Sequence, residues 1–177
     1  MVFIKINTYI FSTLLLLLVG LSSNAQQIQW IGFEEAIAKS EKEPKNILID
    51  IYTDWCGYCK KMDQDTYRNN AITDIINENF YAVKLNAEQK KSIYYKGKEY
   101  KYINNGRRGY HELAASILHG KMSYPTTVFM DKNGRFIQKI PGYLDAETIE
   151  PILVYFGEER HLEESWETFL QEYSSKL

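Results

Sequence analysis

The sequence predicts an α/β fold in which a buried strand leads directly into a helix. Residues 47–53 are an apolar run rich in isoleucine, which is typical of a strand buried on both faces. The run breaks at Trp55, and a polar, helix-compatible stretch follows from Lys60 to about Asn69. Isoleucines at helical spacing predict a second helix around residues 71–79, and the next strand is expected at residues 80–86.

Both cysteines of the chain lie at the junction between this strand and this helix. Cys56 is expected at the helix N-terminus, whose partial positive charge stabilises a thiolate, the reactive form of cysteine. Cys59 follows about one turn later and is close enough to close a small disulfide ring with Cys56. A strand, a C-x-x-C pair and a helix in this order are what a reversible dithiol needs.

This stretch resembles the active site of the thioredoxin superfamily. Members of that superfamily have a Trp before the first Cys and a Lys after the second, which correspond to Trp55 and Lys60. They also have a buried Asp six residues before the first Cys, and Asp50 holds that place.

Three later segments extend the resemblance in the same order along the chain. Residues 83–86 resemble the strand whose lysine, here Lys84, partners the buried Asp. Residues 124–129 resemble the cis-proline strand that faces the active site, and Gly142 resembles the glycine after the last strand. The resemblance covers about residues 45–157 and implies a thioredoxin-like fold, a central mixed sheet with helices on both faces.

The resemblance implies thiol–disulfide exchange with no cofactor or metal, only a redox-active disulfide between Cys56 and Cys59. The Cys56 thiolate would attack a client disulfide, and Cys59 would resolve the mixed disulfide. Asp50, desolvated beneath the pair, is expected to have a raised pKa and to move the Cys59 proton, with Lys84 setting its charge state. The alternative is that Asp50 and Lys84 form a purely structural ion pair.

Five residues are expected to form the substrate groove. Trp55 would support the loop and line the groove, and Tyr124 would offer backbone groups to an extended client. Pro125 is expected to be cis, and its missing N–H would leave the approach to the sulfur open. Gly57 and Tyr58, between the cysteines, are expected to tune the redox poise.

Other uses of the cysteine pair are less consistent with the sequence. A structural disulfide closing so short a loop would constrain the unfolded chain little. A zinc site would need further ligands, and His111, His119 and His161 have no recognisable ligand spacing. We expect His111 and His119 on the surface. Haem attachment would need a histidine where Lys60 stands.

Residues 1–25 are expected to be a signal peptide, with one charge at Lys5, a short apolar core at residues 9–21 and small residues before the cleavage site. The apolar core falls short of the roughly 20 residues that span a bilayer, and no Cys follows Ala25 to carry a lipid. Residues 26–177 would then form one exported, for instance periplasmic, domain. Cleavage changes the formal net charge from −2 to −3, which does not suggest a nucleic-acid partner, and a monomer is favoured.

Residues 89–108 depart from the thioredoxin pattern. They carry one acid, Glu99, and a larger set of basic residues: Lys90, Lys91, Lys96, Lys98, Lys101, Arg107 and Arg108. A hairpin with a turn at Gly97 is expected over residues 92–103. Basic and tyrosine side chains can bind nucleic acid or glycans. We favour a solvated hairpin whose tyrosines pack on the domain, and a third possibility is that it shapes the rim of the groove.

The remaining segments complete the expected fold. An edge strand is expected at residues 26–30, and the other expected elements are helices at 33–42, 109–120 and 145–156 and a hairpin of strands at 124–130 and 135–140. Pro151 should kink the last of these helices or delay its regular part. An extension, residues 158–177, is expected to add a helix at about 162–173. Its apolar residues should pack on the body: Leu162, Trp166, Phe169, Leu170 and Tyr173.

We therefore expect an exported thiol–disulfide oxidoreductase that acts on protein disulfides, with a reductase favoured. Gly57 and Tyr58 supply no cation to hold the Cys56 thiolate, and the Asp50–Lys84 pair resembles that of thioredoxin, which is a reductant. The resemblance therefore implies a potential nearer about −270 mV than −180 mV. A reductase would need a membrane electron donor. The alternatives are an isomerase, since Cys-Gly-Tyr-Cys resembles the site of periplasmic disulfide isomerases, an oxidase on the same fold, or a non-catalytic chaperone.

Overall fold

The computed structural model describes residues 27–106 and 108–177. The expected signal peptide, residues 1–25, lies outside the described residues, and so does Arg107. Within the described ranges, no helix is long and apolar enough to cross a membrane.

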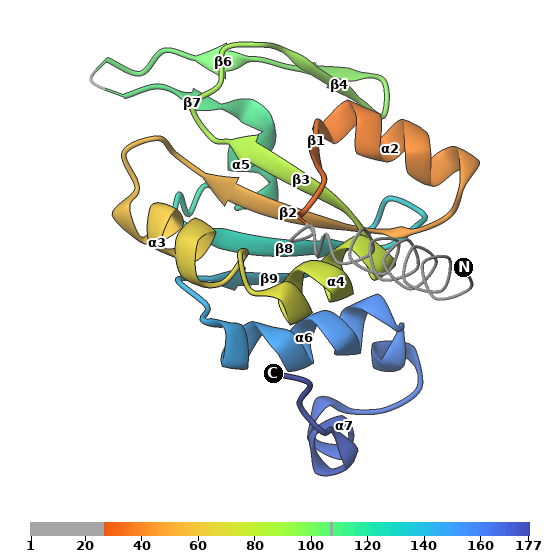
Figure 1. Cartoon of the computed structure of the whole chain (residues 1–177). Helices are drawn as coiled ribbons and strands as arrows, with labels where there is room; N and C mark the ends of the chain where they lie inside the picture. The colour runs from red at the N-terminus through yellow and green to blue at the C-terminus, as the bar shows by residue number, and fades with distance from the viewer. Residues whose placement is uncertain (1–26, 107) are drawn as a thin grey trace, which may run out of the picture.

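A five-stranded mixed sheet forms the centre of the molecule, in the order β1-β3-β2-β8-β9 (Figure 1). Strand β3 lies parallel to both β1 and β2, whereas β8 runs antiparallel to β2 and to β9. The strands are β1 (Trp30–Ile31), β2 (Asn46–Tyr52), β3 (Phe80–Asn86), β8 (Thr126–Met130) and β9 (Phe136–Pro141). The expected thioredoxin-like mixed sheet is confirmed. The edge strand was expected at residues 26–30, whereas β1 begins at the last of these residues, Trp30, and ends at Ile31.

Helices cover both faces of this sheet, as expected (Figure 1). One face is covered by α2 (Phe33–Lys42) and α5 (Glu112–Ile117). The other face is covered by α3 (Gly57–Asp65), α4 (Asn70–Asn79) and α6 (Ala146–Gly157).

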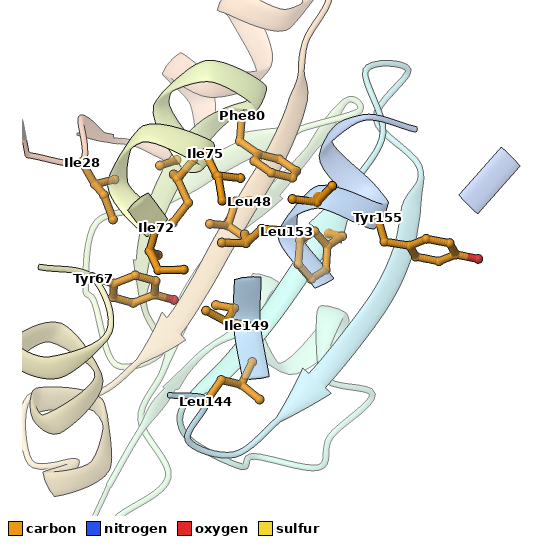
Figure 2. Packing of buried hydrophobic residues seen from close by; sticks show 14 of the residues in the cluster. Ile28, Leu48, Tyr67, Ile72, Ile75, Phe80, Leu144, Ile149, Leu153 and Tyr155 are labelled. Atoms are coloured by element: carbon orange, nitrogen blue, oxygen red, sulfur yellow. The ribbon is translucent and has the colours of Figure 1, made fainter. Parts of the chain in front are cut away.

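Strand β2 is buried on both faces because its side chains alternate between two apolar clusters. Leu48 packs with Ile72 of α4 and Ile149 of α6, as Figure 2 shows. The isoleucines on the other face of the strand pack toward α2 and α5: Ile47, Ile49 and Ile51. Each such aliphatic side chain contributes roughly 1.5–3 kcal/mol of burial free energy. Since side chains alternate along a strand, Asp50 shares the face of Leu48 and lies in the layer beneath α3.

The active-site helix is displaced from the expected residues 60–69. It begins at Gly57, with Cys56 as its N-cap, and ends at Asp65. The Thr66 hydroxyl then donates to the Leu144 carbonyl oxygen (2.6 Å), and Asn69 caps the next helix. Two helices are present as expected, each with its own cap, and the first begins and ends three to four residues earlier than predicted.

The insertion forms two small sheets. The expected hairpin is present as β4 (Ile93–Tyr95) and β5 (Lys98–Tyr100), with a turn at Lys96 and Gly97 where both residues have positive φ. Strand β6 (Tyr102–Ile103) instead pairs with β7 (Tyr110–His111).

The hairpin is only partly solvated, because Ile93 and Tyr95 belong to the buried cluster on the α2 face. The Tyr95 ring meets that of Phe33 edge to face at 5.1 Å. The expectation that tyrosines of this segment pack on the domain is confirmed for Tyr95.

The prediction of a surface position for His111 is wrong. His111 is fully buried and caps α5, since its Nδ1 atom accepts the Leu113 N–H and its Nε2 atom lies 3.2 Å from the Lys91 carbonyl oxygen. Burial lowers the pKa of His111. The helix consequently begins at Glu112 and not at residue 109.

The C-terminal part differs from expectation in two respects. Helix α6 is continuous from Ala146 through Pro151, so its regular part is not delayed. A 3₁₀ turn (Arg160–Leu162) precedes a shorter last helix, α7 (Trp166–Glu172). Its aromatic residues pack on the body as expected: Trp166, Phe169 and Tyr173. Leu162 and Leu170 are exposed, which corrects the prediction for both; Leu162 belongs to the turn and not to the helix.

Candidate active site

The two cysteines form a disulfide at the N-terminus of α3. Their Cα atoms lie 5.3 Å apart, and the Cys59 N–H donates to the Cys56 sulfur over 3.0 Å. Of the two side chains, Cys56 is less completely enclosed than Cys59. In the reduced protein the same N–H group and helix dipole would stabilise negative charge on Cys56.

Asp50 and Lys84 form an ion pair in the layer beneath α3, in which Asp50 is buried and Lys84 is partly buried. The two residues are partners in the β2–β3 register, and Lys84 Nζ lies 2.6 Å from Asp50 Oδ2. Burial raises the pKa of Asp50, and the Lys84 charge opposes this rise without cancelling it. Burial also disfavours the charged form of Lys84, but two neighbouring carboxylates outweigh this effect and raise its pKa.

The second of these carboxylates belongs to Asp63, which was not expected in the site. Asp63 lies on α3, pairs with Lys84 and is 44% exposed. Seven residues separate it from Cys56, about two helical turns, so the helical period was a signal that would have found it.

Three aromatic rings complete the surroundings of the Lys84 ammonium group. Its nitrogen lies 4.9, 5.1 and 5.2 Å from the ring centroids of Trp30, Tyr52 and Tyr67. Cation–π attraction to rings at this distance is favourable. The cation is therefore held between two carboxylates and three rings.

The second oxygen of Asp50 is in a different environment. Asp50 Oδ1 is buried without a hydrogen-bond partner among the described residues, and so are the hydroxyls of Tyr67 and Thr127. Thr127 faces Asp50 in the β2–β8 register. A buried carboxylate oxygen without a partner favours the protonated form, in agreement with the raised pKa of Asp50.

Trp55 is held on three sides beside the cysteines. Its indole N–H donates to Glu88 Oε1 (3.0 Å), and its ring meets Tyr124 edge to face at 5.9 Å. The Arg108 guanidinium lies 4.1 Å from the centroid of the same ring. Trp55 nevertheless remains 49% exposed, so part of its surface is open to a partner. Glu88 and Arg108 were not among the expected site residues, because both come from loops distant in sequence.

The two residues between the cysteines, Gly57 and Tyr58, are exposed at the surface. A Cβ atom on Gly57 would meet nothing within 4 Å, and Tyr58 is exposed. The Tyr58 ring lies 6.3 Å from that of Tyr143, over which Lys61 also sits.

The Tyr124–Pro125 peptide bond is cis, as expected. The Pro125 carbonyl oxygen accepts the N–H of Gly142 over 2.8 Å. Gly142 has φ +102°, a conformation that favours glycine and accounts for its place after β9. Burial, together with the Glu88 charge, raises the pKa of Tyr124 to about 12, so its hydroxyl stays protonated at neutral pH.

The part of the chain that the structure describes contains no cluster of three metal-binding side chains. The groups that the site offers are the Cys56–Cys59 pair, the Asp50 carboxyl group and the Lys84 cation that pairs with it.

A disulfide at a strand-to-helix junction, with a buried Asp–Lys pair below it and a cis-proline strand beside Trp55, defines a thioredoxin-like site. The family described as a thioredoxin-like domain matches residues 33–157. The chain belongs to this family, and its fold is that of thioredoxin-like thiol–disulfide oxidoreductases with a Cys56–Cys59 pair.

Two relatives match this chain over a small part of their own length. Spermatogenesis-associated protein 20 of Rattus norvegicus is 30% identical over 67 residues, which are 37% of this chain and 8% of the relative. A protein disulfide-isomerase of Schizosaccharomyces pombe is 25% identical over 139 residues, 78% of this chain and 31% of the relative. The chain thus spans less than a third of the length of either relative.

Solved structures share the fold at low sequence identity. A thioredoxin from Thermus thermophilus has a TM-score of 0.55 at 17% identity, covering 78% of this chain and 98% of that one. A DsbH oxidoreductase has a TM-score of 0.54 at 16% identity, covering 76% of this chain and 87% of that one.

Proposed function

We propose that this protein is an exported thiol–disulfide oxidoreductase that reduces disulfides in protein clients. The observation that carries the proposal is the Cys56–Cys59 disulfide at the N-terminus of α3 above the Asp50–Lys84 pair. Export rests on the sequence of residues 1–25, which has the pattern of a signal peptide.

The proposed reaction has two exchanges. The Cys56 thiolate attacks one sulfur of the client disulfide, so that a Cys56–client bond forms and the other client sulfur leaves as a thiolate that takes up a proton. Cys59 then loses its proton and attacks the Cys56 sulfur, which closes the Cys56–Cys59 disulfide and releases the second client thiol. The client gains two electrons and the protein loses two.

Asp50 is the proposed acceptor of the Cys59 proton. Its raised pKa brings its protonation equilibrium closer to neutral pH, where a carboxyl group can both accept and release a proton. Lys84 holds one Asp50 oxygen and leaves the other free. The proton can return to solvent past Asp63, which together with Tyr67 lines a cleft of about 510 Å³.

The proposed groove is formed by residues around the disulfide. Pro125 has no N–H, so it leaves the approach to the sulfur open, and the backbone of Tyr124 is available to an extended client. Trp55 and Tyr58 supply exposed aromatic surface on either side of Gly57. A membrane-bound electron donor would return the disulfide to the dithiol.

Trapping of clients tests the assignment of roles. Cys59→Ser should accumulate mixed disulfides with clients, because attack by Cys56 proceeds and resolution does not, whereas Cys56→Ser should accumulate none. Non-reducing gels of extracts that contain each variant give the result. Equal trapping by both variants would contradict the assigned order.

Three measurements separate the reductase from its alternatives. A reductase should reduce insulin with dithiothreitol as electron source and have a potential nearer about −270 mV than −180 mV in glutathione or dithiothreitol buffers. A disulfide isomerase, as the relative in Schizosaccharomyces pombe is named, should instead refold scrambled ribonuclease. A potential near about −120 mV would reject the reductase in favour of an oxidase. No turnover of insulin would point to a client-binding chaperone.

A further inference from the structure

Among the described residues of the inserted segment, Arg108 lies over the ring of Trp55. Its guanidinium carbon lies 4.1 Å from the centroid of the Trp55 ring, and Trp55 directly precedes Cys56. Within the described residues, Arg108 forms no ion pair with an acidic side chain. The cation over the Trp55 ring therefore has no ion-pair partner among the described residues.

The loop that carries Arg108 has a fixed base. Strands β6 and β7 pair through Tyr102 with His111 and through Ile103 with Tyr110. A Cβ atom on Gly109 would lie 2.2 Å from the Tyr102 hydroxyl and 2.4 Å from the Ile103 carbonyl oxygen, so only glycine fits next to Arg108.

A second contact joins this base to the segment that follows β3. The His111 N–H donates to the Ala87 carbonyl oxygen over 2.7 Å, and the next residue, Glu88, accepts the indole N–H of Trp55. The loop and the edge of the indole are thus held by neighbouring residues, and Arg108 reaches the ring from a supported position.

Stacking on the indole leaves the donor groups of Arg108 available. A guanidinium that lies over an aromatic face directs its N–H groups outward in its own plane, in the fork geometry that matches a carboxylate. Glu88 engages the indole N–H at the ring edge, and Asp54 accepts from Asn86 Nδ2 at 3.1 Å. These two acids disfavour a carboxylate beside them, whereas the Arg108 guanidinium over the ring face favours one.

We propose that Arg108 and Trp55 form a subsite for an acidic side chain of the client polypeptide, close in sequence to the client cysteine that Cys56 attacks. The inserted segment is then a specificity element that selects disulfides flanked by Asp or Glu and disfavours those flanked by Lys or Arg. This inference rests on the proposed exchange reaction and adds the charge of its preferred clients.

The test uses short blocked peptides that carry a single cysteine in disulfide linkage to thionitrobenzoate. One series has Glu, Gln or Lys at each position from three before to three after the cysteine. Stopped-flow release of thionitrobenzoate by the reduced protein gives a second-order rate constant for each peptide. Wild type should react about five- to tenfold faster with the Glu peptide than with the Lys peptide at one or two positions, and less so in high salt.

Variants assign this preference to Arg108. In Arg108→Gln the Glu-to-Lys rate ratio should fall to near 1, and Arg108→Lys should restore part of it. The matched control is Lys98→Gln, which removes a cation that stacks on Tyr100 at 4.5 Å elsewhere in the insertion and should keep the full ratio. Because each ratio compares two peptides on one variant, a general loss of reactivity cancels.

Two results would overturn the subsite. One is a wild-type ratio near 1 at every position, and the other is a ratio that Arg108→Gln leaves intact. Failure of the exchange reaction is recognised separately, since a protein without it would release no thionitrobenzoate from any peptide or from the small reagent dithiobis(nitrobenzoate).

Discussion

Lys84 Nζ lies 2.6 Å from Asp50 Oδ2 and pairs at the same time with Asp63 on α3. The lysine therefore connects a fully buried carboxyl group on β2 with a half-exposed one on α3. Asp63 offsets part of the effect of Lys84 on Asp50, because the Asp63 charge raises the pKa of Asp50 while the Lys84 charge lowers it.

Replacing Asp50 with Asn should stabilise the protein and slow exchange. Burial raises the pKa of Asp50 in the folded protein above its value in the unfolded chain. The folded protein therefore loses stability as the pH rises from the unfolded pKa through the folded pKa. Asn does not ionise, so the variant does not suffer this loss. Lys84 keeps Asp63 as a partner, so the variant does not leave a buried cation unpaired. We expect the free energy of unfolding at pH 7 to increase by about 1–3 kcal/mol.

Urea unfolding at pH 4 and pH 7 checks this prediction, with insulin reduction measured on the same preparations. The gain from Asp50→Asn should be smaller at pH 4 than at pH 7, because the raised pKa of Asp50 leaves more of the wild type protonated at the lower pH. A less stable variant with unchanged turnover would make Asp50 a structural partner only.

Replacing Asp63 with Asn should shift the pH dependence of the resolving step. The Asp63 charge adds to the effect of burial in raising the pKa of Asp50, so its removal lowers that pKa and moves the midpoint of the rate profile to lower pH. The stability change should stay within about 0.5 kcal/mol, because Asp63 is 44% exposed. Asp65→Asn is the control, since Asp65 is on the same helix but pairs with exposed Lys61. An equal shift in both variants would mean that only net charge matters.

Cys56 should be the fast-alkylating thiol of the reduced protein. It caps α3 and faces the Cys59 N–H, whereas Cys59 is inside the helix and almost fully buried. In Cys59→Ser, the pH of half-maximal iodoacetamide reactivity should lie below the free-thiol value of about 8.5. The reciprocal variant, Cys56→Ser, should react much more slowly at every pH. A midpoint at or above the free value would remove the argument for an activated nucleophile.

Acidification should weaken the base of the insertion through His111. Burial lowers its folded-state pKa below the unfolded value of about 6.5, so stability present above that value is lost as pH falls through it. Protonation would also end the bond that Nδ1 accepts from Leu113. His111→Asn should lower the free energy of unfolding by about 1 kcal/mol at pH 7, because the contact with Lys91 is lost. Between pH 7 and pH 5 the variant should lose less stability than the wild type, because it has no imidazole to protonate. Urea unfolding of the wild type and of His111→Asn at pH 7 and pH 5 tests this prediction. An equal loss of unfolding free energy in both proteins between the two pH values would refute it.

The deletion of the whole hairpin is not a clean test of the insertion. Ile93 and Tyr95 are part of the buried cluster on the α2 face, so removing residues 92–103 would open the core as well as the rim. Single substitutions at exposed positions such as Arg108 and Lys98 separate recognition from stability.

The sequence alone determined the features that are local along the chain. A buried strand, a helix start and two cysteines within one turn are encoded by adjacent residues, so the position of the dithiol followed from spacing and burial pattern. The resemblance to thioredoxin extended this to Asp50, Lys84 and the cis bond at Pro125, and the structure brings the first two within hydrogen-bond distance.

Contacts between distant segments were decided by the tertiary structure. Arg108 meets Trp55 across more than fifty residues of chain because β6 and β7 pair and His111 binds Ala87, and no local pattern encodes that meeting. His111 was expected on the surface because its polar character was visible in the sequence, whereas the carbonyl of Lys91 and the amide of Leu113 that satisfy it inside were not. Side-chain burial and shared ion pairs depend on which backbones are adjacent in space, and that adjacency exists only once the sheet and its helices have assembled.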